Sequence, residues 1–289
     1  MSKYPIMIIG CGDIGLRVAK LHLHEGDSVA ALARSSASEQ RLRLKGITPV
    51  TGDLDQPSSL QTLSTRSALL YYFAPPPGEA NIDPRMKALL DSIQPGEGPT
   101  KIVYISTSGV YGDCHGGWVT EQSPVNPRTA RAKARLAAET LLLKWGRQTA
   151  TPIVILRVGG IYGPGRLPIE HIEEGLPVLR IAESPYTNRI HADDLARICM
   201  AAALHGEADI YNVSDGEPST MTDYFNAVAD LLNLPRPPQI TMAEAQWKLS
   251  PAMLSYLTES RRMDNRRMIE ELGVTLLYPN LQAGLAASI

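Results

Sequence analysis

The chain has 289 residues, of which 44% are hydrophobic and 20% charged, and its formal net charge at pH 7 is −2. This composition is that of a globular protein able to bury a sizeable core. The charge balance gives no reason to expect a nucleic-acid partner, which would need a dominant basic face. No membrane partner is expected, because the apolar run at residues 6–9 is far too short for a membrane span or a secretion signal.

The three cysteines (Cys11, Cys114 and Cys199) are widely spaced and form no CxxC pair. This spacing predicts neither a disulfide framework nor a metal site. We therefore expect the protein to reside in the reducing cytoplasm.

Short, continuous apolar runs alternate with helical patterns along most of the chain. Strands buried on both faces are predicted at residues 5–9, 28–33, 69–73, 102–105, 153–158 and 210–213. The first run is followed by apolar residues at helical spacing (Ile14, Val18 and Leu21). Further helices are predicted over residues 84–93, 130–145, 192–204 and 221–232. This alternation indicates βαβ units with right-handed crossovers and a mostly parallel sheet covered on both faces.

Two segments interrupt the alternation. Residues 162–178 (YGPGRLPIEHIEEGLPV) are rich in proline and glycine, and residues 233–240 (NLPRPPQI) open a tail without the strand–helix rhythm. We expect both to build a smaller lobe over the carboxyl edge of the sheet, where open α/β sheets bind ligands.

A glycine motif, G-x-G-x-x-G, is formed by Gly10, Gly12 and Gly15 between the first strand and the first helix. Gly10 permits the tight turn, Gly12 lets the backbone approach a pyrophosphate, and Gly15 allows close helix–strand packing. The helix N-terminus, with Asp13 and Ile14, then offers unpaired N–H groups to the phosphates. The alternative, glycines that serve only a tight turn, is disfavoured by this context.

The end of the second predicted strand indicates which dinucleotide binds. An NAD-binding fold usually has an acid there, about 20 residues beyond the glycine loop, to hold the ribose 2′-hydroxyl. This chain instead has Arg34 and Ser35. Because a guanidinium suits a 2′-phosphate, we expect NADP, with NAD as the alternative cofactor. An Arg34 that is merely a solvated loop residue is the competing interpretation.

Seven segments in order resemble the extended short-chain dehydrogenase/reductase superfamily, often labelled NAD-dependent epimerase/dehydratase. They are GCGDIG (10–15), GDL (52–54), STSGVYG (106–112), LRVGGIYGPGR (156–166), RIHADDLA (189–196), YNVSDGEP (211–218) and NRRMIEELGVTLLYPNLQAGL (265–285). The resemblance implies an α/β fold: a Rossmann-type doubly wound parallel sheet with a small C-terminal substrate lobe. The dinucleotide-binding domain would comprise residues 1–165 with 190–229, and the substrate-binding lobe residues 166–189 with 230–289.

The resemblance also assigns roles to individual residues. The cofactor would be contacted by Asp53 and Leu54 beside the adenine, Ala74 and Pro75 near the ribose and pyrophosphate, and Ser106, Lys133 and Gly159 further along the chain. Thr107 would be the catalytic Ser/Thr, and Lys133 the catalytic lysine that bonds the nicotinamide ribose. Tyr111 is the best spare phenol, although packing is the favoured interpretation of it.

The family's catalytic pair, Tyr-x-x-x-Lys, is incomplete here because Thr129 stands four residues before Lys133. An aliphatic hydroxyl is a far weaker acid than a phenol and is shorter, so Thr129 cannot replace the tyrosine directly. Two hypotheses follow. The chain is an NAD(P)-dependent oxidoreductase on a small carbonyl/alcohol or sugar-derived substrate, or it is a catalytically silent dinucleotide-binding sensor or scaffold protein.

Further departures narrow the substrate. Ser108 and Gly109 stand where related dehydratases have an Asp-Glu pair, and Gly160 where sugar-nucleotide epimerases often have Asn. Four residues are candidates to meet an anionic substrate in the lobe: Arg189, His191, Arg261 and Arg262. By analogy with the family, a homodimer would form through the helices at 84–93 and 130–145, the second of which is rich in alanine.

Overall fold

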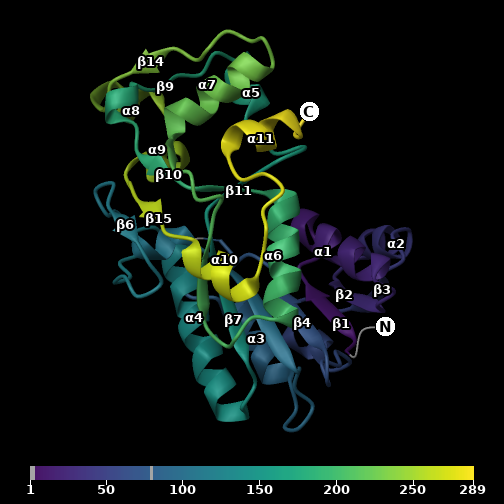
Figure 1. The fold of residues 1–289 in the computed structure, drawn as a ribbon. Coiled ribbons are helices and arrows are strands. Elements are labelled where there is room, and N and C mark those ends of the chain that lie inside the picture. Colours follow the sequence, from purple (N-terminus) through teal and green to yellow (C-terminus); the bar gives the residue numbers. More distant parts are fainter. Residues whose placement is uncertain (1–3, 79–80) are drawn as a thin grey trace.

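A computed structural model describes residues 4–78 and 81–289 and shows a seven-stranded, entirely parallel sheet (Figure 1). The strand order is β12-β7-β5-β4-β1-β2-β3, so β1 lies between β2 and β4 and the direction of winding reverses there. The strands are β1 (Ile6–Ile9), β2 (Val29–Ala33), β3 (Thr48–Thr51), β4 (Leu69–Tyr72), β5 (Lys101–Thr107), β7 (Ile153–Val158) and β12 (Ile210–Val213). This topology confirms the predicted Rossmann-type α/β fold.

Helices cover both faces of the sheet (Figure 1). One face packs against α1 (Asp13–His24), α2 (Ser36–Arg43), α6 (Ala192–Leu204) and α10 (Arg266–Leu272). The other packs against α3 (Pro84–Ser92), α4 (Ala130–Thr149) and the short η1 (Pro57–Leu60). Every strand of the sheet interior is therefore buried on both sides, which explains the continuous apolar runs.

Each of the predicted strands and helices is present, with ends that differ by a few residues. Among the elements that were not predicted are α2 and β3, which belong to the sheet domain. The sequence of α2 is polar, with Leu42 as its one buried side chain. The strand β3 lies at the sheet edge with no fully buried residue, so neither element carries a strong apolar pattern.

A smaller lobe lies beyond the carboxyl edge of the sheet (Figure 1). Its helices are α5 (Ile169–Glu173), α7 (Met221–Leu231), α8 (Met242–Lys248), α9 (Pro251–Leu257) and α11 (Leu281–Ala286). Short strands lie within the lobe or between it and the sheet domain: β6 (Trp118–Val119), β8 (Gly160–Tyr162), β9 (Val178–Leu179), β10 (Tyr186–Thr187), β11 (Arg189–His191), β13 (Ser219–Thr220), β14 (Gln239–Ile240) and β15 (Arg262–Met263).

The packing differs from the expected domain boundaries at two helices. Residues of α7 share a core with Tyr162 and Ile172, so this helix belongs to the lobe rather than with residues 190–229. Helix α10 packs on the sheet through Met268 and Leu272, although residues 230–289 were expected in the lobe. In both cases the helix belongs with the hydrophobic core against which its apolar face packs.

The alanines of α4 do not form an outer surface for a second copy. Ala132, Ala134 and Ala138 are buried within the protein itself. The homodimer expected through α3 and α4 stays a prediction. Within the described residues, no helix combines the length and apolarity needed to span a membrane.

A buried polar network fixes α4 against the sheet. The guanidinium of Arg157 on β7 donates to both carboxylate oxygens of Glu139 on α4, the shortest contact being 2.8 Å. Ser106 on β5 also donates to Glu139. Arg157 donates to the hydroxyl of Tyr111 at 3.1 Å, and Tyr111 donates to Asn212 on β12 at 2.7 Å. These contacts tie α4 to three strands.

The Glu139–Arg157 pair should contribute strongly to stability, because removing one partner leaves the other buried and uncompensated. We expect Glu139→Gln to lower the free energy of unfolding by about 3–5 kcal/mol. Urea unfolding followed by circular dichroism measures this. The exposed Lys87–Asp91 pair is the control, and Lys87→Met should change stability by at most about 1 kcal/mol. Equal effects from both substitutions would contradict the prediction.

Candidate functional site

Two adjoining pockets lie at the carboxyl edge of the sheet. The first, here called the glycine-loop pocket, has a volume of about 510 Å³ and surrounds the loop between β1 and α1. The second, the lobe pocket, has about 470 Å³ and lies between the ends of β5 and β7 and the lobe. Ile161 and Arg166 line both pockets, so a ligand in one meets a ligand in the other.

Each glycine of the loop has its own structural reason. Gly10 has φ +88°, and a Cβ there would lie 2.4 Å from the backbone nitrogen of Ala74 on the neighbouring chain segment. A Cβ at Gly15 would lie 3.1 Å from the carbonyl oxygen of Gly10. At Gly12, in contrast, a Cβ would meet no atom within 4 Å, because the position opens into the pocket. Only Gly12 is therefore free of an internal packing reason and available to a ligand.

The glycine-loop pocket is rich in positive charge. It is lined by five arginines (Arg34, Arg41, Arg85, Arg135 and Arg166) but only two acids (Asp13 and Asp53). Four of these arginines are anchored: Arg41 to the carbonyl of Cys11 at 3.1 Å, Arg85 to Asp55 at 2.5 Å, Arg166 to Asp13 at 2.5 Å, and Arg135 to the carbonyl of Ile105 at 2.8 Å. Burial raises the pKa of Asp13, but hydrogen bonds from Arg166 and Arg17 outweigh it and keep that pKa below its ordinary value. The surplus of guanidinium groups suits a ligand with several phosphates.

Most residues expected to hold the cofactor line this pocket. They are Gly10, Gly12, Asp13, Ile14, Gly15, Arg34, Asp53, Leu54, Ala74 and Pro75. Gly159 lines the lobe pocket instead. Ser35 does not line the pocket, because its hydroxyl caps α2, and Ser38 lines it in its place. Ser106 is also corrected: it is buried beneath the pockets and donates to Glu139.

The role expected of Lys133 requires correction as well. Its side chain is exposed and lines neither pocket. Arg135 lines the glycine-loop pocket and donates to the carbonyl of Ile105 at 2.8 Å. Two residues along an α-helix correspond to a rotation of about 200°, so Lys133 and Arg135 point in nearly opposite directions.

The apolar pattern of α4 contained the signal for this register. Leu142 and Ala138 are buried against the sheet. The residues three and four positions earlier on the same helix face are Arg135 and then Arg131, whereas Lys133 lies on another face. Arg131 lines the lobe pocket, so the pair four residues apart that faces the two pockets is Arg131 and Arg135.

The hydroxyl candidates fall into two groups. Thr107 and Thr129 both line the lobe pocket, where Thr107 caps η2 (Ser108–Tyr111) and Thr129 caps α4 by accepting from the backbone of Ala132 at 3.2 Å. Tyr111 lines neither pocket and is 1% exposed. Burial raises its pKa, which the charge of Arg157 offsets only in part. This placement fits the favoured interpretation of Tyr111 as a packing residue and not the alternative of a spare acid.

A different phenol occupies the lobe pocket next to α4. Tyr256 of α9 accepts a hydrogen bond from Nη1 of Arg131 at 2.8 Å, and the guanidinium also lies 4.6 Å from the ring centroid. Tyr256 is 48% exposed and lines the pocket together with Thr107 and Thr129. It lies in the least patterned part of the chain, where no motif or apolar periodicity pointed to it.

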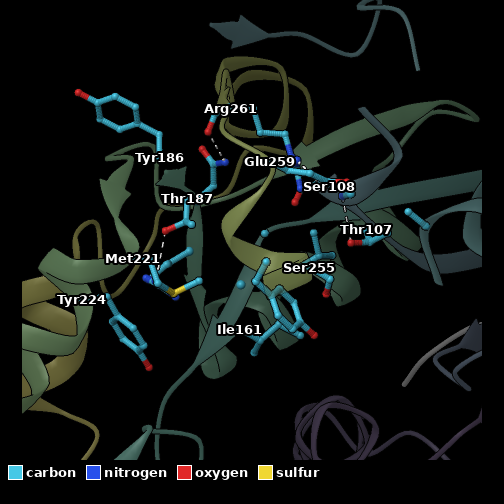
Figure 2. A pocket seen from close by; sticks show the side chains of 18 of the residues that line it. Thr107, Ser108, Ile161, Tyr186, Thr187, Met221, Tyr224, Ser255, Glu259 and Arg261 are labelled. Carbon is cyan, nitrogen blue, oxygen red and sulfur yellow. Dashed lines mark hydrogen bonds and ion pairs between the residues drawn. The ribbon is translucent and has the colours of Figure 1, made fainter. Parts of the chain in front are cut away.

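Four arginines and one carboxylate line the lobe pocket: Arg131, Arg166, Arg189, Arg261 and Glu259. Figure 2 shows Thr107 and Ser108 on one side, Met221 and Tyr224 on the lobe side, and Glu259 and Arg261 above them. Of the candidates for an anionic substrate, Arg189 and Arg261 line the pocket. His191 and Arg262 do not: His191 caps α6, and Arg262 donates to the carbonyl of Gly116.

Comparison with protein-family models gives a match to the NAD dependent epimerase/dehydratase family over residues 6–214. Among curated proteins, YeeZ of Escherichia coli is 24% identical over 95% of this chain and 96% of its own length. Protein y4nG of Sinorhizobium fredii is 31% identical, and dTDP-glucose 4,6-dehydratase of Streptomyces niveus 30% identical, over 45% and 42% of this chain. These two alignments span only 35% and 38% of the relatives' own lengths.

Solved structures share the fold over the whole chain. A functionally unknown conserved protein from Silicibacter pomeroyi DSS has a TM-score of 0.84 and 30% identity, covering 99% of this chain and 98% of that one. UDP-glucose 4-epimerase of Thermotoga maritima, solved with UDP-glucose, has a TM-score of 0.80 and 18% identity over 98% and 97% of the two chains. At that identity the second likeness shows the fold alone.

The three glycines should respond differently to substitution. We expect Gly12→Val to keep the wild-type unfolding midpoint and to abolish dinucleotide binding, because the new side chain fills open pocket space. Gly10→Ala should cost at least about 2 kcal/mol of stability, because both its backbone conformation and its contact with Ala74 are unfavourable. Thermal unfolding and fluorescence titration with a reduced dinucleotide measure the two effects. A Gly12→Val protein that binds normally would contradict this assignment.

Proposed function

This chain belongs to the NAD-dependent epimerase/dehydratase family, and on that premise we propose that it is an NAD(P)-dependent oxidoreductase. Its substrate is a small carbonyl or alcohol compound or a sugar-derived one. The observation that carries the proposal is the junction of the two pockets at Ile161 and Arg166. A dinucleotide along the glycine loop would end where a substrate under the lobe begins.

The glycine-loop pocket fits a dinucleotide. Gly12 leaves open space for a pyrophosphate, and the N-terminus of α1 supplies N–H groups. Arg34, Ser38 and Arg41 line the end of the pocket beyond β2, and the described residues that directly follow β2 there include no acid to hold a 2′-hydroxyl. We therefore favour NADP over NAD. When bound, the dinucleotide supplies the two-electron redox chemistry.

Proton transfer to or from the substrate oxygen needs a group of this chain. We assign it to Tyr256, the phenol that lines the lobe pocket beside Arg131. A guanidinium that donates to the phenolic oxygen stabilises the charge that develops there when the proton leaves. Thr107 and Thr129 offer hydroxyl groups to orient the same substrate oxygen. In this assignment Arg131 and Tyr256 together replace the missing Tyr-x-x-x-Lys pair.

The named relatives bear on the substrate class. They include dTDP-glucose 4,6-dehydratase of Streptomyces niveus, which supports a sugar-derived substrate. Ser108 and Gly109 follow Thr107 here and present no carboxylate for acid–base elimination. Reduction or oxidation is therefore favoured over dehydration.

A second candidate function is a catalytically silent dinucleotide-binding sensor or scaffold protein. The absence of a tyrosine on α4 within reach of the pockets favours it. Absorbance of the reduced nicotinamide, followed across a panel of carbonyl and alcohol compounds, separates the two functions. Turnover supports the enzyme, whereas tight dinucleotide binding without turnover supports the sensor.

The cytoplasm is the proposed location of the protein. Among the described residues, Cys11, Cys114 and Cys199 are free thiols, and two of them are buried. Free cysteines suit a reducing compartment. A homodimer through α3 and α4 is proposed by family analogy alone, and size-exclusion chromatography with light scattering tests it.

Nucleotide preference depends on Arg34. We expect the wild-type protein to bind NADPH more tightly than NADH, and Arg34→Ser to weaken NADPH binding by about 10- to 100-fold, the worth of one charge-assisted hydrogen bond. NADH affinity should change little. Arg43→Ser, on the exposed side of α2, is the control for loss of one charge. Tighter binding of NADH by the wild type would contradict the NADP assignment.

The role of Tyr256 predicts a kinetic effect without a binding effect. We expect Tyr256→Phe to lower kcat by about 10²- to 10⁴-fold, the usual contribution of general acid–base catalysis, with unchanged NADPH affinity. Tyr278→Phe, a phenol outside the lobe pocket, is the control. Full activity in Tyr256→Phe would exclude Tyr256 as the proton donor.

A further inference from the structure

We propose that the lobe pocket selects substrates that carry an anionic group, a carboxylate or a phosphate monoester, and that Arg189 binds this group. The inference rests on the proposed function in one respect only, the placement of the substrate in the lobe pocket. It names a substrate class that the family membership leaves open.

Arg189 is a buried cation without a matching anion. It is 8% exposed and lines the lobe pocket from β11. Its guanidinium lies 3.6 Å from the ring centroid of Tyr224, and its polar contacts are Thr187 Oγ1 at 3.2 Å and Met221 Sδ at 3.6 Å. The Nε–H group has no hydrogen-bond partner among the described residues.

A guanidinium in this state is costly to maintain. Burying a charge without a paired anion is unfavourable, and proteins usually neutralise such a group with a carboxylate. Burial lowers the pKa of Arg189 to about 10, so the group still carries its charge at neutral pH. The cost is offset when a ligand supplies the anion.

The neighbouring acids do not supply that anion. Across the described residues, no carboxylate lies within ion-pair distance of Arg189. Asp215 acts on it through charge, but burial raises the pKa of Asp215 to about 7, which leaves it only partly ionised at neutral pH. Glu259 is already bound to Arg261 at 2.9 Å.

Gly160 leaves the guanidinium open to the pocket. A Cβ at this position would lie 3.2 Å from Nη1 of Arg189, so a larger side chain would displace the guanidinium or cover it. Gly160 itself is exposed and lines the pocket between Gly159 and Ile161. The glycine at position 160 therefore keeps the buried guanidinium of Arg189 accessible from the pocket.

The location sets the size of the substrate. Gly160 lines the lobe pocket directly before Ile161, which lines both pockets, so an anion on Arg189 would lie close to the reacting carbon. This geometry favours hydroxy or keto acids, or small phosphorylated carbonyl compounds. In both classes the anionic group and the reacting carbon belong to one compact molecule.

The test uses binding, so that it does not depend on turnover. Thermal unfolding of the NADPH-saturated protein is measured with inorganic phosphate, with malonate and with neutral malonamide, at constant ionic strength. A ligand that binds only the folded state raises the midpoint in a saturable way. We expect malonamide to have no effect, and whichever of phosphate or malonate raises the midpoint identifies the anionic group.

Four variants locate the effect. Arg189→Met should weaken anion binding at least tenfold, by the usual worth of charge-assisted hydrogen bonds. Arg189→Lys should restore only part of the affinity, since an ammonium lacks the planar fork. Gly160→Asn should also weaken anion binding. The control is Arg128→Met, an exposed arginine outside the pocket, which should bind anions as the wild type does.

Stability gives the second readout. Without anions, Arg189→Met should unfold at or above the wild-type midpoint, because an uncompensated buried charge has been removed. A large loss of stability would show that Arg189 has a structural role and would overturn the proposal. An unchanged anion response in Arg189→Met, or no saturable response in the wild type, would also overturn it.

Failure of this inference and failure of the proposed function are distinguishable. If the protein reduces neutral carbonyl compounds and does not bind anions, the oxidoreductase function is supported and the anion site is contradicted. If the protein binds anions through Arg189 but oxidises or reduces no compound, the oxidoreductase function is contradicted and the anion site is supported.

Discussion

The buried ion pair between Glu139 and Arg157 is the interaction on which the geometry of the site depends. It joins α4 to β7, and through Ser106 and Tyr111 it reaches β5 and β12. An α-helix is rigid over this length, so one fixed side chain sets its rotation about its axis. Arg135 and Arg131 are therefore directed toward the pockets, and Lys133 toward solvent.

The same interaction explains why two family positions have structural roles here. Ser106 and Tyr111 belong to a conspicuous motif, STSGVYG, yet their hydroxyl groups serve the network beneath the pockets. Because a buried polar group must be hydrogen-bonded, these residues are held by Glu139, Arg157 and Asn212. In the proposed function, the chemistry of the lobe pocket is assigned instead to Tyr256 and Arg189, which line that pocket.

The arginines of the two pockets differ in the groups that they contact. In the glycine-loop pocket, arginines exceed acids, and several are anchored by Asp13, Asp55 or backbone carbonyls. In the lobe pocket, Arg131 contacts a phenol and Arg189 contacts only neutral groups. Anchored arginines suit a ligand that binds in one fixed pose, whereas an arginine without a matching anion indicates where a ligand can complete the site.

The sequence by itself determined the fold class and the glycine loop, since both depend on local patterns of apolar residues and on glycines at fixed spacing. It could not reveal α2 and β3, whose residues are mostly polar and lie at the sheet edge. Only the tertiary structure decided the burial of Tyr111, the contact of Tyr256 with Arg131 and the isolation of Arg189. The physical reason is that each depends on contacts between segments distant in the chain, which no local pattern encodes.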